Sequence, residues 1–120
     1  PEGSGPFLNA VVLVDTTLSA PTLMDRAMAI EDAFERDREA ERNAPRTLDV
    51  DLIVVGDRRS NEAFLRLPHP RAGERPFVLQ PWYDLEPDAV LPDAGPVAAL
   101  LEKVGTEGIA RRDDLALDVQ

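Results

Sequence analysis

The stretch Leu48-Asp49-Val50-Asp51-Leu52-Ile53-Val54-Val55 is the most informative part of the sequence for the fold. In a strand, successive side chains point to opposite faces, so one face carries Leu48, Val50, Leu52 and Val54 and the other carries Asp49, Asp51, Ile53 and Val55. Both faces are apolar in the second half of the stretch. The pattern therefore predicts a strand covered on both sides, and Gly56-Asp57 predicts the turn that ends it.

The residues before this strand predict another strand and a helix. Residues 7–18 are rich in Val, Leu and Thr, which indicates a strand. Ser19-Ala20-Pro21 then combines a capping hydroxyl with a proline in the first turn, the usual beginning of a helix. An apolar stripe follows at spacings of four, three and four residues: Leu23, Ala27, Ile30 and Phe34. Residues 35–42 are almost wholly charged, and we expect a frayed helix end that passes into a loop.

The residues after the strand predict shorter elements. Residues 60–67 indicate a short edge strand or a loop, and the prolines of Leu67-Pro68-His69-Pro70 require an extended backbone. Residues 75–85 predict a short helix or an irregular packing segment, because Pro76 and Pro81 interrupt an apolar run. Residues 96–104 predict a helix that ends at Gly105, and a last strand is expected around residues 115–119.

Length and composition bound the possible functions. The chain has 120 residues, which suits one domain (residues 1–120, with a variable tail over 105–120), and a formal net charge of -10. That charge disfavours nucleic acid and anionic membranes as partners. No apolar run approaches the roughly 20 residues of a membrane-spanning helix. The absence of cysteine suits the reducing cytoplasm, where we expect the protein to act as a monomer.

Asp49 and Asp51 are candidate metal ligands. Their alpha carbons would lie roughly 6.5 Å apart on one face of a strand. Two carboxylates so close repel each other unless a cation lies between them, and Mg²⁺ prefers one or two carboxylates together with water and substrate phosphates. The alternative is a pair of solvated aspartates at the beginning of a strand.

Basic side chains gather near this pair in an otherwise acidic chain. Phosphoryl transfer requires cations that stabilise developing charge, and the preceding segment supplies Arg36, Arg38, Arg42 and Arg46. The alternative is a solvated loop whose charges pair with one another. Further along, the single histidine, His69, precedes two more arginines and could contact a triphosphate. Asn9 could bind a heterocycle edge, and two phenylalanines could either stack on a flat ring or belong to the core: Phe7 and Phe77.

Together these residues resemble the bacterial 6-hydroxymethyl-7,8-dihydropterin pyrophosphokinases of folate biosynthesis. The strongest match is Pro45-Arg46-Thr47-Leu48-Asp49-Val50-Asp51-Leu52. Four further motifs match in order and spacing, so that the resemblance covers roughly residues 6–104: Phe7-Leu8-Asn9-Ala10, Ile30-Glu31, Leu67-Pro68-His69-Pro70-Arg71 and Glu74-Arg75-Pro76-Phe77-Val78-Leu79.

The resemblance implies an α+β, ferredoxin-like antiparallel sheet flanked by helices, and transfer of pyrophosphate from ATP to a hydroxymethyl-dihydropterin. It implies that Asp49 and Asp51 hold two Mg²⁺ ions. It assigns Arg36 and Arg46 to the transferring group. It places ATP at Arg38, His69 and Arg75, and the pterin at Phe7, Asn9 and Phe77.

The sequence departs from the family pattern in two places. Asn43-Ala44 replaces the usual Trp-Gly before the Pro-Arg, and Glu35 replaces a glycine, which predicts altered closure of the catalytic loop. Nothing matches the family's first 45 residues or so, which contribute a strand that lies between those expected at 7–18 and 48–55. We therefore expect an upstream segment, or a fused folate-pathway domain, to complete the sheet. Two alternatives remain: a truncated, non-catalytic remnant that binds nucleotide or serves as a structural or interaction domain, and an acidic interaction module.

Overall fold

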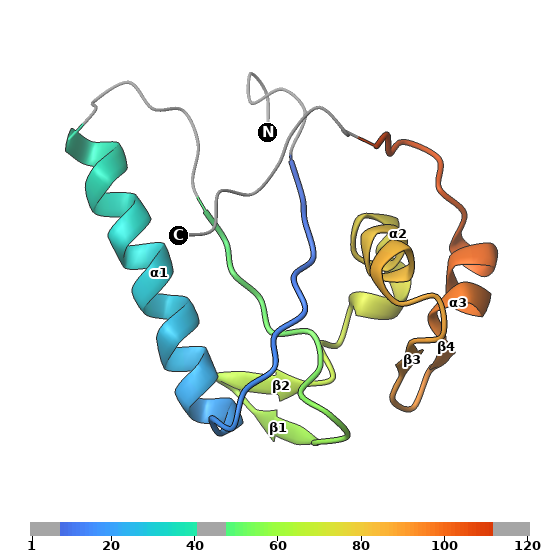
Figure 1. Cartoon of the computed structure of the whole chain (residues 1–120), viewed down its shortest axis with the longest axis horizontal. Helices are drawn as coiled ribbons and strands as arrows, with labels where there is room; N and C mark the ends of the chain where they lie inside the picture. Colours follow the sequence, from blue (N-terminus) through green and yellow to red (C-terminus); the bar gives the residue numbers. More distant parts are fainter. Residues whose placement is uncertain (1–7, 41–47, 112–120) are drawn as a thin grey trace.

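Residues 8–40 and 48–111 are described by the structure, a computed structural model, with the backbone alone for residues 37–40. These ranges hold three α-helices, one short 3-10 helix and two two-stranded antiparallel sheets, which confirms the α+β class. In Figure 1, α1 (Ala20–Ala40) forms one side of the molecule, and α2 (Pro76–Leu85) with α3 (Val97–Val104) forms the other. Two long segments without regular structure, residues 8–19 and 48–55, run between the two sides.

Helix α1 begins where the sequence predicts. The Ser19 carbonyl accepts the Leu23 N–H at 2.9 Å, and the Ser19 hydroxyl oxygen accepts the Thr22 N–H at 3.3 Å. The helix end predicted from residue 35 is helical as far as Ala40, and the loop expected after it lies outside the described residues. Glu, Arg and Ala are good helix formers, so these residues stay helical without an apolar anchor.

Only the first half of α1 is well packed. Ala20 and Ala27 are each 4% exposed, whereas Ile30 and Phe34, the second half of the predicted stripe, are 53% and 37% exposed. Ala20 belongs to a small core cluster with Leu65 and Leu67, against which Met24, Leu52 and Val55 also pack. This cluster attaches α1 to the rest of the protein near its beginning.

The strands predicted at 7–18 and 48–55 are not found in the described residues. A strand requires a partner about 4.8 Å away to satisfy its backbone groups. The backbone of residues 8–15 makes no hydrogen bond within the described ranges. Residues 52–55 pack on both sides as expected, but the predicted alternation of faces is wrong: Leu52 and Val55 contact the cluster beside α1, while Ile53 and Val54 contact the cluster beneath α2.

The sequence after Gly56 forms a hairpin. The predicted turn is present, closed by the Arg58 N–H donating to the Val55 carbonyl at 3.0 Å. Strand β1 (Ser60–Glu62) then pairs antiparallel with β2 (Leu65–Leu67), and Ser60 lies opposite Leu67. Leu65 and Leu67 are buried on either side of exposed Arg66, the alternation of a half-buried strand. Residues 60–67 thus form two short paired strands, where the sequence predicted a single short edge strand or a loop.

The main core lies between α2 and α3. Both helices match their predicted ranges to within a residue, and the Gly105 N–H ends α3 by donating to the Leu101 carbonyl at 2.8 Å. A 3-10 turn, η1 (Ala72–Glu74), precedes α2, and a hairpin that the sequence did not predict, β3 (Val90–Leu91) with β4 (Gly95–Pro96), joins the helices. The buried cluster consists of Ala72, Val78, Leu79, Trp82, Leu91, Val97 and Leu101.

The strand expected around residues 115–119 lies outside the described residues. Within the described ranges, no helix has the length and apolar character required to cross a membrane.

Candidate functional site

The carboxylate pair lies on the segment between the two halves of the protein. Asp49 and Asp51 are both exposed, and neither side chain makes a hydrogen bond or ion pair within the described part of the chain. The residues directly after them, Leu52 to Val55, are held by the two core clusters. Two carboxylates therefore project from the first half of a segment whose second half is anchored.

Helix α1 is joined to this segment beside the two aspartates. The Val50 N–H donates a hydrogen bond to Oε2 of Glu31 at 2.5 Å, a contact between residues 19 positions apart. Val50 lies between Asp49 and Asp51 in the chain, so the bond is made to the backbone that joins the two aspartates. The sequence had shown Glu31 only as part of a family motif and gave no indication of this partner.

His69 is joined to the same segment from the other direction. Its backbone N–H donates to the Ile53 carbonyl at 2.8 Å, two residues after Asp51. The half-buried ring accepts the Arg71 N–H at Nδ1, at 3.2 Å. With Nδ1 occupied as an acceptor, the hydrogen of a neutral imidazole lies on Nε2, which can donate to a ligand.

Arg75 and Phe77 lie together at the beginning of α2. Arg75 is the residue before the helix, and its guanidinium carbon is 5.5 Å from the centroid of the Phe77 ring. The Arg75 carbonyl accepts the N–H groups of Val78 and Leu79, which fixes the backbone at this point. A cation over an aromatic face, at the positive end of a helix, favours an anionic or flat ligand.

The remaining predicted site residues are not joined to these groups. Arg36 is exposed on α1 and Asn9 is exposed in the segment 8–19, and neither side chain contacts another described residue through a hydrogen bond or ion pair. Arg38 lies on the last turns of α1, but its side chain is outside the description. Phe7 and Arg46 lie outside the described residues.

The donor set suits Mg²⁺ only as part of a larger coordination shell. No group of three or more His, Cys, Asp or Glu side chains in the described ranges could surround a metal ion. Mg²⁺ is commonly bound by one or two carboxylates, with water and substrate phosphates completing its six positions. Asp49 and Asp51, as exposed oxygen ligands with open surroundings, fit that arrangement.

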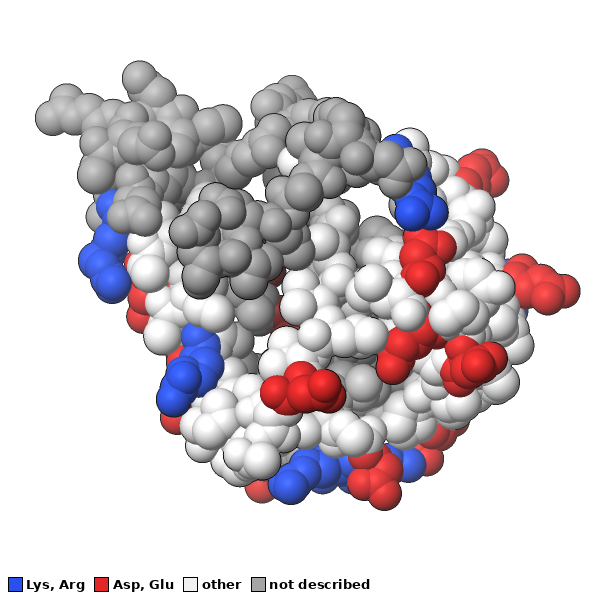
Figure 2. All heavy atoms as spheres, in the orientation of Figure 1, with Lys and Arg blue, Asp and Glu red and all other residues white. Residues whose placement is uncertain are grey.

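The surface charge is unevenly distributed. On the face seen in Figure 2, acidic side chains are spread over the α2–α3 half, while several cations lie over α1 and at the end near β1.

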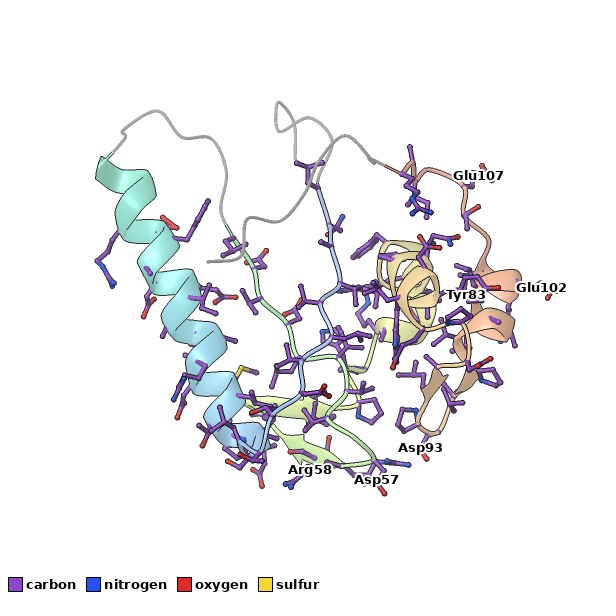
Figure 3. The ribbon with its side chains drawn as sticks, in the orientation of Figure 1. Asp57, Arg58, Tyr83, Asp93, Glu102 and Glu107 are labelled. Atoms are coloured by element: carbon purple, nitrogen blue, oxygen red, sulfur yellow. The ribbon has the colours of Figure 1, made fainter. Side chains whose placement is uncertain are left out.

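An ion pair far from the carboxylates links the two halves. Nε and Nη2 of Arg59 donate to the two carboxylate oxygens of Asp93 at 2.7 and 3.1 Å. Figure 3 shows Asp93 on the β3–β4 turn, near the turn that carries Asp57 and Arg58. The hydrogen bonds from Arg59 lower the pKa of Asp93, and the same contact raises the pKa of Arg59. The sequence offered no indication of this contact, since its partners are 34 residues apart.

The family model and two of the individual relatives that match this chain describe the same enzyme. Residues 1–87 match the family described as 7,8-dihydro-6-hydroxymethylpterin-pyrophosphokinase (HPPK). A 2-amino-4-hydroxy-6-hydroxymethyldihydropteridine pyrophosphokinase from Synechocystis sp. is 43% identical over 99 residues, which are 82% of this chain and 50% of that protein. The protein of the same name from Pseudomonas aeruginosa is 40% identical over 105 residues, 88% of this chain and 64% of that protein.

A third relative has a broader name. A folate synthesis bifunctional protein from Chlamydia caviae is 39% identical over 74 residues, 62% of this chain and 17% of that protein. The chain spans from half to just under two thirds of the length of the two pyrophosphokinases above. The family match covers more than half of the chain and includes both aspartates, the histidine and the beginning of α2, and on these grounds the chain belongs to the 7,8-dihydro-6-hydroxymethylpterin-pyrophosphokinase family.

Proposed function

We propose that the protein catalyses transfer of the terminal pyrophosphoryl group of ATP to the hydroxymethyl oxygen of 6-hydroxymethyl-7,8-dihydropterin, a step of folate biosynthesis. The observation that carries the proposal is the family match over residues 1–87, which contains an exposed carboxylate pair suited to Mg²⁺ and phosphates. Relatives named for this activity are about 40% identical over most of the chain.

The reaction needs no covalent intermediate with the protein. The hydroxymethyl oxygen attacks the β-phosphorus of ATP, and the bond between that phosphorus and the oxygen bridging to the α-phosphorus breaks. AMP leaves with the bridging oxygen, and the hydroxyl proton passes to solvent or to a base. Catalysis then depends on positioning and on stabilising charge over the phosphate oxygens.

In this proposal Asp49 and Asp51 hold two Mg²⁺ ions against the triphosphate. When bound, these ions neutralise charge on the phosphate oxygens and align them for attack. The exposure of both carboxylates supports the assignment, because a ligand to a metal–ATP complex must be reachable from solvent. Their attachment to a segment anchored at Leu52–Val55 supports a fixed position for the pair.

Other residues in the proposal bind the two substrates. Nε2 of His69 would donate to ATP, and the Arg75 guanidinium would pair with a phosphate while resting on the Phe77 ring. Phe77 is 37% exposed, which supports a second role in stacking on the pterin. The remaining assignments rest on the family motif and on side chains available for contact: Arg36 and Arg46 on the transferring group, Arg38 on ATP, and Phe7 and Asn9 on the pterin.

We also propose that residues 8–18 and 48–55 form part of a ferredoxin-like antiparallel sheet, with a further strand between them. Both segments carry exposed apolar side chains in the structure, including Val12 at 61%, Val14 at 67% and Leu48 at 37%. The backbone of residues 8–15 is free of hydrogen bonds within the described ranges. A paired strand would satisfy these groups and cover the side chains.

The proposal places the protein in the cytoplasm as a monomer. One related protein is named as bifunctional in folate synthesis, which supports a fusion partner from the same pathway.

The test is release of AMP from ATP by the full-length protein in the presence of Mg²⁺ and the pterin. We expect AMP only when the pterin is present, and a loss of at least about 100-fold in rate for Asp49→Asn and for Asp51→Asn. Asp88→Asn, which changes an exposed carboxylate after α2, serves as the control and should leave the rate unchanged. ATP binding without AMP release would instead support the non-catalytic alternative.

A further inference from the structure

The hydrogen bond between Glu31 and Val50 connects a side chain of α1 to the backbone that joins Asp49 and Asp51. The Val50 N–H belongs to the peptide that joins Val50 to Asp49, and Oε2 of Glu31 accepts it at 2.5 Å. Since a peptide nitrogen lies about 2.4 Å from the preceding alpha carbon, Oε2 lies within about 5 Å of the Asp49 alpha carbon. Glu31 therefore contacts the backbone that carries the two aspartates.

A hydrogen bond to this one N–H restricts both carboxylates. The peptide unit is planar, so holding its N–H fixes the plane that links residues 49 and 50. Holding this peptide restricts the backbone rotations of Asp49 and Val50, which limits where the Asp49 side chain points and how the chain continues to Asp51. Within the described ranges, the stretch 48–51 makes no other hydrogen bond, so the restraint on this end comes from Glu31.

Glu31 also joins the segment that carries the two aspartates to α1. Arg36 lies about 7.5 Å further along the axis of the same helix. Glu31 thus links the helix that carries Arg36 to the segment that carries the proposed metal ligands.

We propose that Glu31 is a positioning residue that holds Asp49 and Asp51 in the arrangement required for the metal–ATP complex. It acts through the Val50 backbone and not as a metal ligand. The proposal rests on the proposed function for the purpose of the pair, while the anchoring contact itself can be tested without it.

The first measurement is the Mg²⁺ dependence of pterin-dependent AMP release by the full-length protein. Glu31→Ala removes the acceptor, and we expect about 10-fold more Mg²⁺ at half-maximal rate, in the range seen when a supporting partner of a metal ligand is lost. Glu31→Gln keeps an oxygen acceptor of the same length, so it should return to within about 3-fold of the unmodified protein. Asp32→Ala, an exposed carboxylate on the next residue, should change nothing.

A second measurement is independent of activity. Amide hydrogen exchange of Val50, followed by NMR, should be about 10-fold faster in Glu31→Ala and nearly unchanged in Glu31→Gln. An unchanged Val50 rate in Glu31→Ala overturns the anchor. If Glu31→Gln needs as much Mg²⁺ at half-maximal rate as Glu31→Ala while its Val50 amide remains protected, then Glu31 acts by its charge or as a ligand, and positioning is refuted. Absence of AMP release from the unmodified protein refutes the proposed function alone, because the exchange rates still decide the anchor.

Discussion

Leu79→Ala tests whether the cluster beneath α2 supports the beginning of that helix, where Arg75 and Phe77 lie. Leu79 is 0% exposed and packs in the same cluster as Trp82 and Val97. Alanine keeps the helix propensity, so the change removes buried carbon atoms and little else.

The expected cost follows from the atoms removed. Three carbons at about 0.8 kcal/mol each give about 2.4 kcal/mol of lost burial. A cavity that closes only partly raises the total to about 3 kcal/mol. The matched control is Leu85→Ala at the last residue of the same helix, which is 52% exposed and leaves no enclosed cavity. Half the burial and no cavity predict about 1 kcal/mol for Leu85→Ala.

Urea unfolding followed by tryptophan fluorescence measures both variants. Trp82 is the single tryptophan of the chain and is 5% exposed beside Leu79, so its emission reports on this cluster. With a slope of about 1.5 kcal/mol per molar urea, the midpoint should fall by about 2 M for Leu79→Ala and by about 0.7 M for Leu85→Ala. Equal shifts for the two variants would refute the packing described here, because the same chemical change would then cost the same at a buried and at an exposed position.

Two further predictions concern the ion pair and the unpaired segment. Arg59 lowers the pKa of Asp93, so the pair stabilises the folded state above the unfolded Asp pKa of about 3.9, and this stabilisation is lost as pH falls through the folded pKa. Asp93→Asn should therefore lower the thermal midpoint most at pH 7, and this deficit should shrink as the pH falls below about 3.9; a deficit of unchanged size at pH 3 contradicts the assignment. In the full-length protein, amides of residues 8–15 should exchange at least about 100-fold more slowly than in an unstructured peptide if they pair in a sheet, and free-peptide rates contradict that sheet.

Several elements could be predicted because their causes lie within a few residues. The Ser19 cap and the adjacent proline specify the beginning of α1, and the contacts of Ser19 with Thr22 and Leu23 have the expected form. The spacing of apolar residues around Pro76 and before Gly105 likewise specifies α2 and α3. The alternation of Leu65, Arg66 and Leu67 is enough to indicate a half-buried strand.

Other elements were predicted wrongly or not at all, because their pairing partners are distant in the sequence or because the elements are very short. The β-pattern of residues 48–55 is strong, but a strand is formed only when another backbone pairs with it, and within the described ranges none does. The β3–β4 hairpin has two residues in each strand, too few to show a period. The stripe on α1 predicted burial for Ile30 and Phe34, yet packing covers only the first half of the helix.

The sequence alone determined which residues are candidates for the site, because the identities and spacing of Asp49, Asp51, His69 and Arg75 are local properties that resemble a family motif. Only the tertiary structure decided what holds those groups. Glu31 reaches Val50 across 19 residues, and the His69 N–H reaches the Ile53 carbonyl from beyond the β1–β2 hairpin. Contacts of this kind depend on how the elements pack against one another, and no pattern of neighbouring residues specifies which distant donor and acceptor will meet.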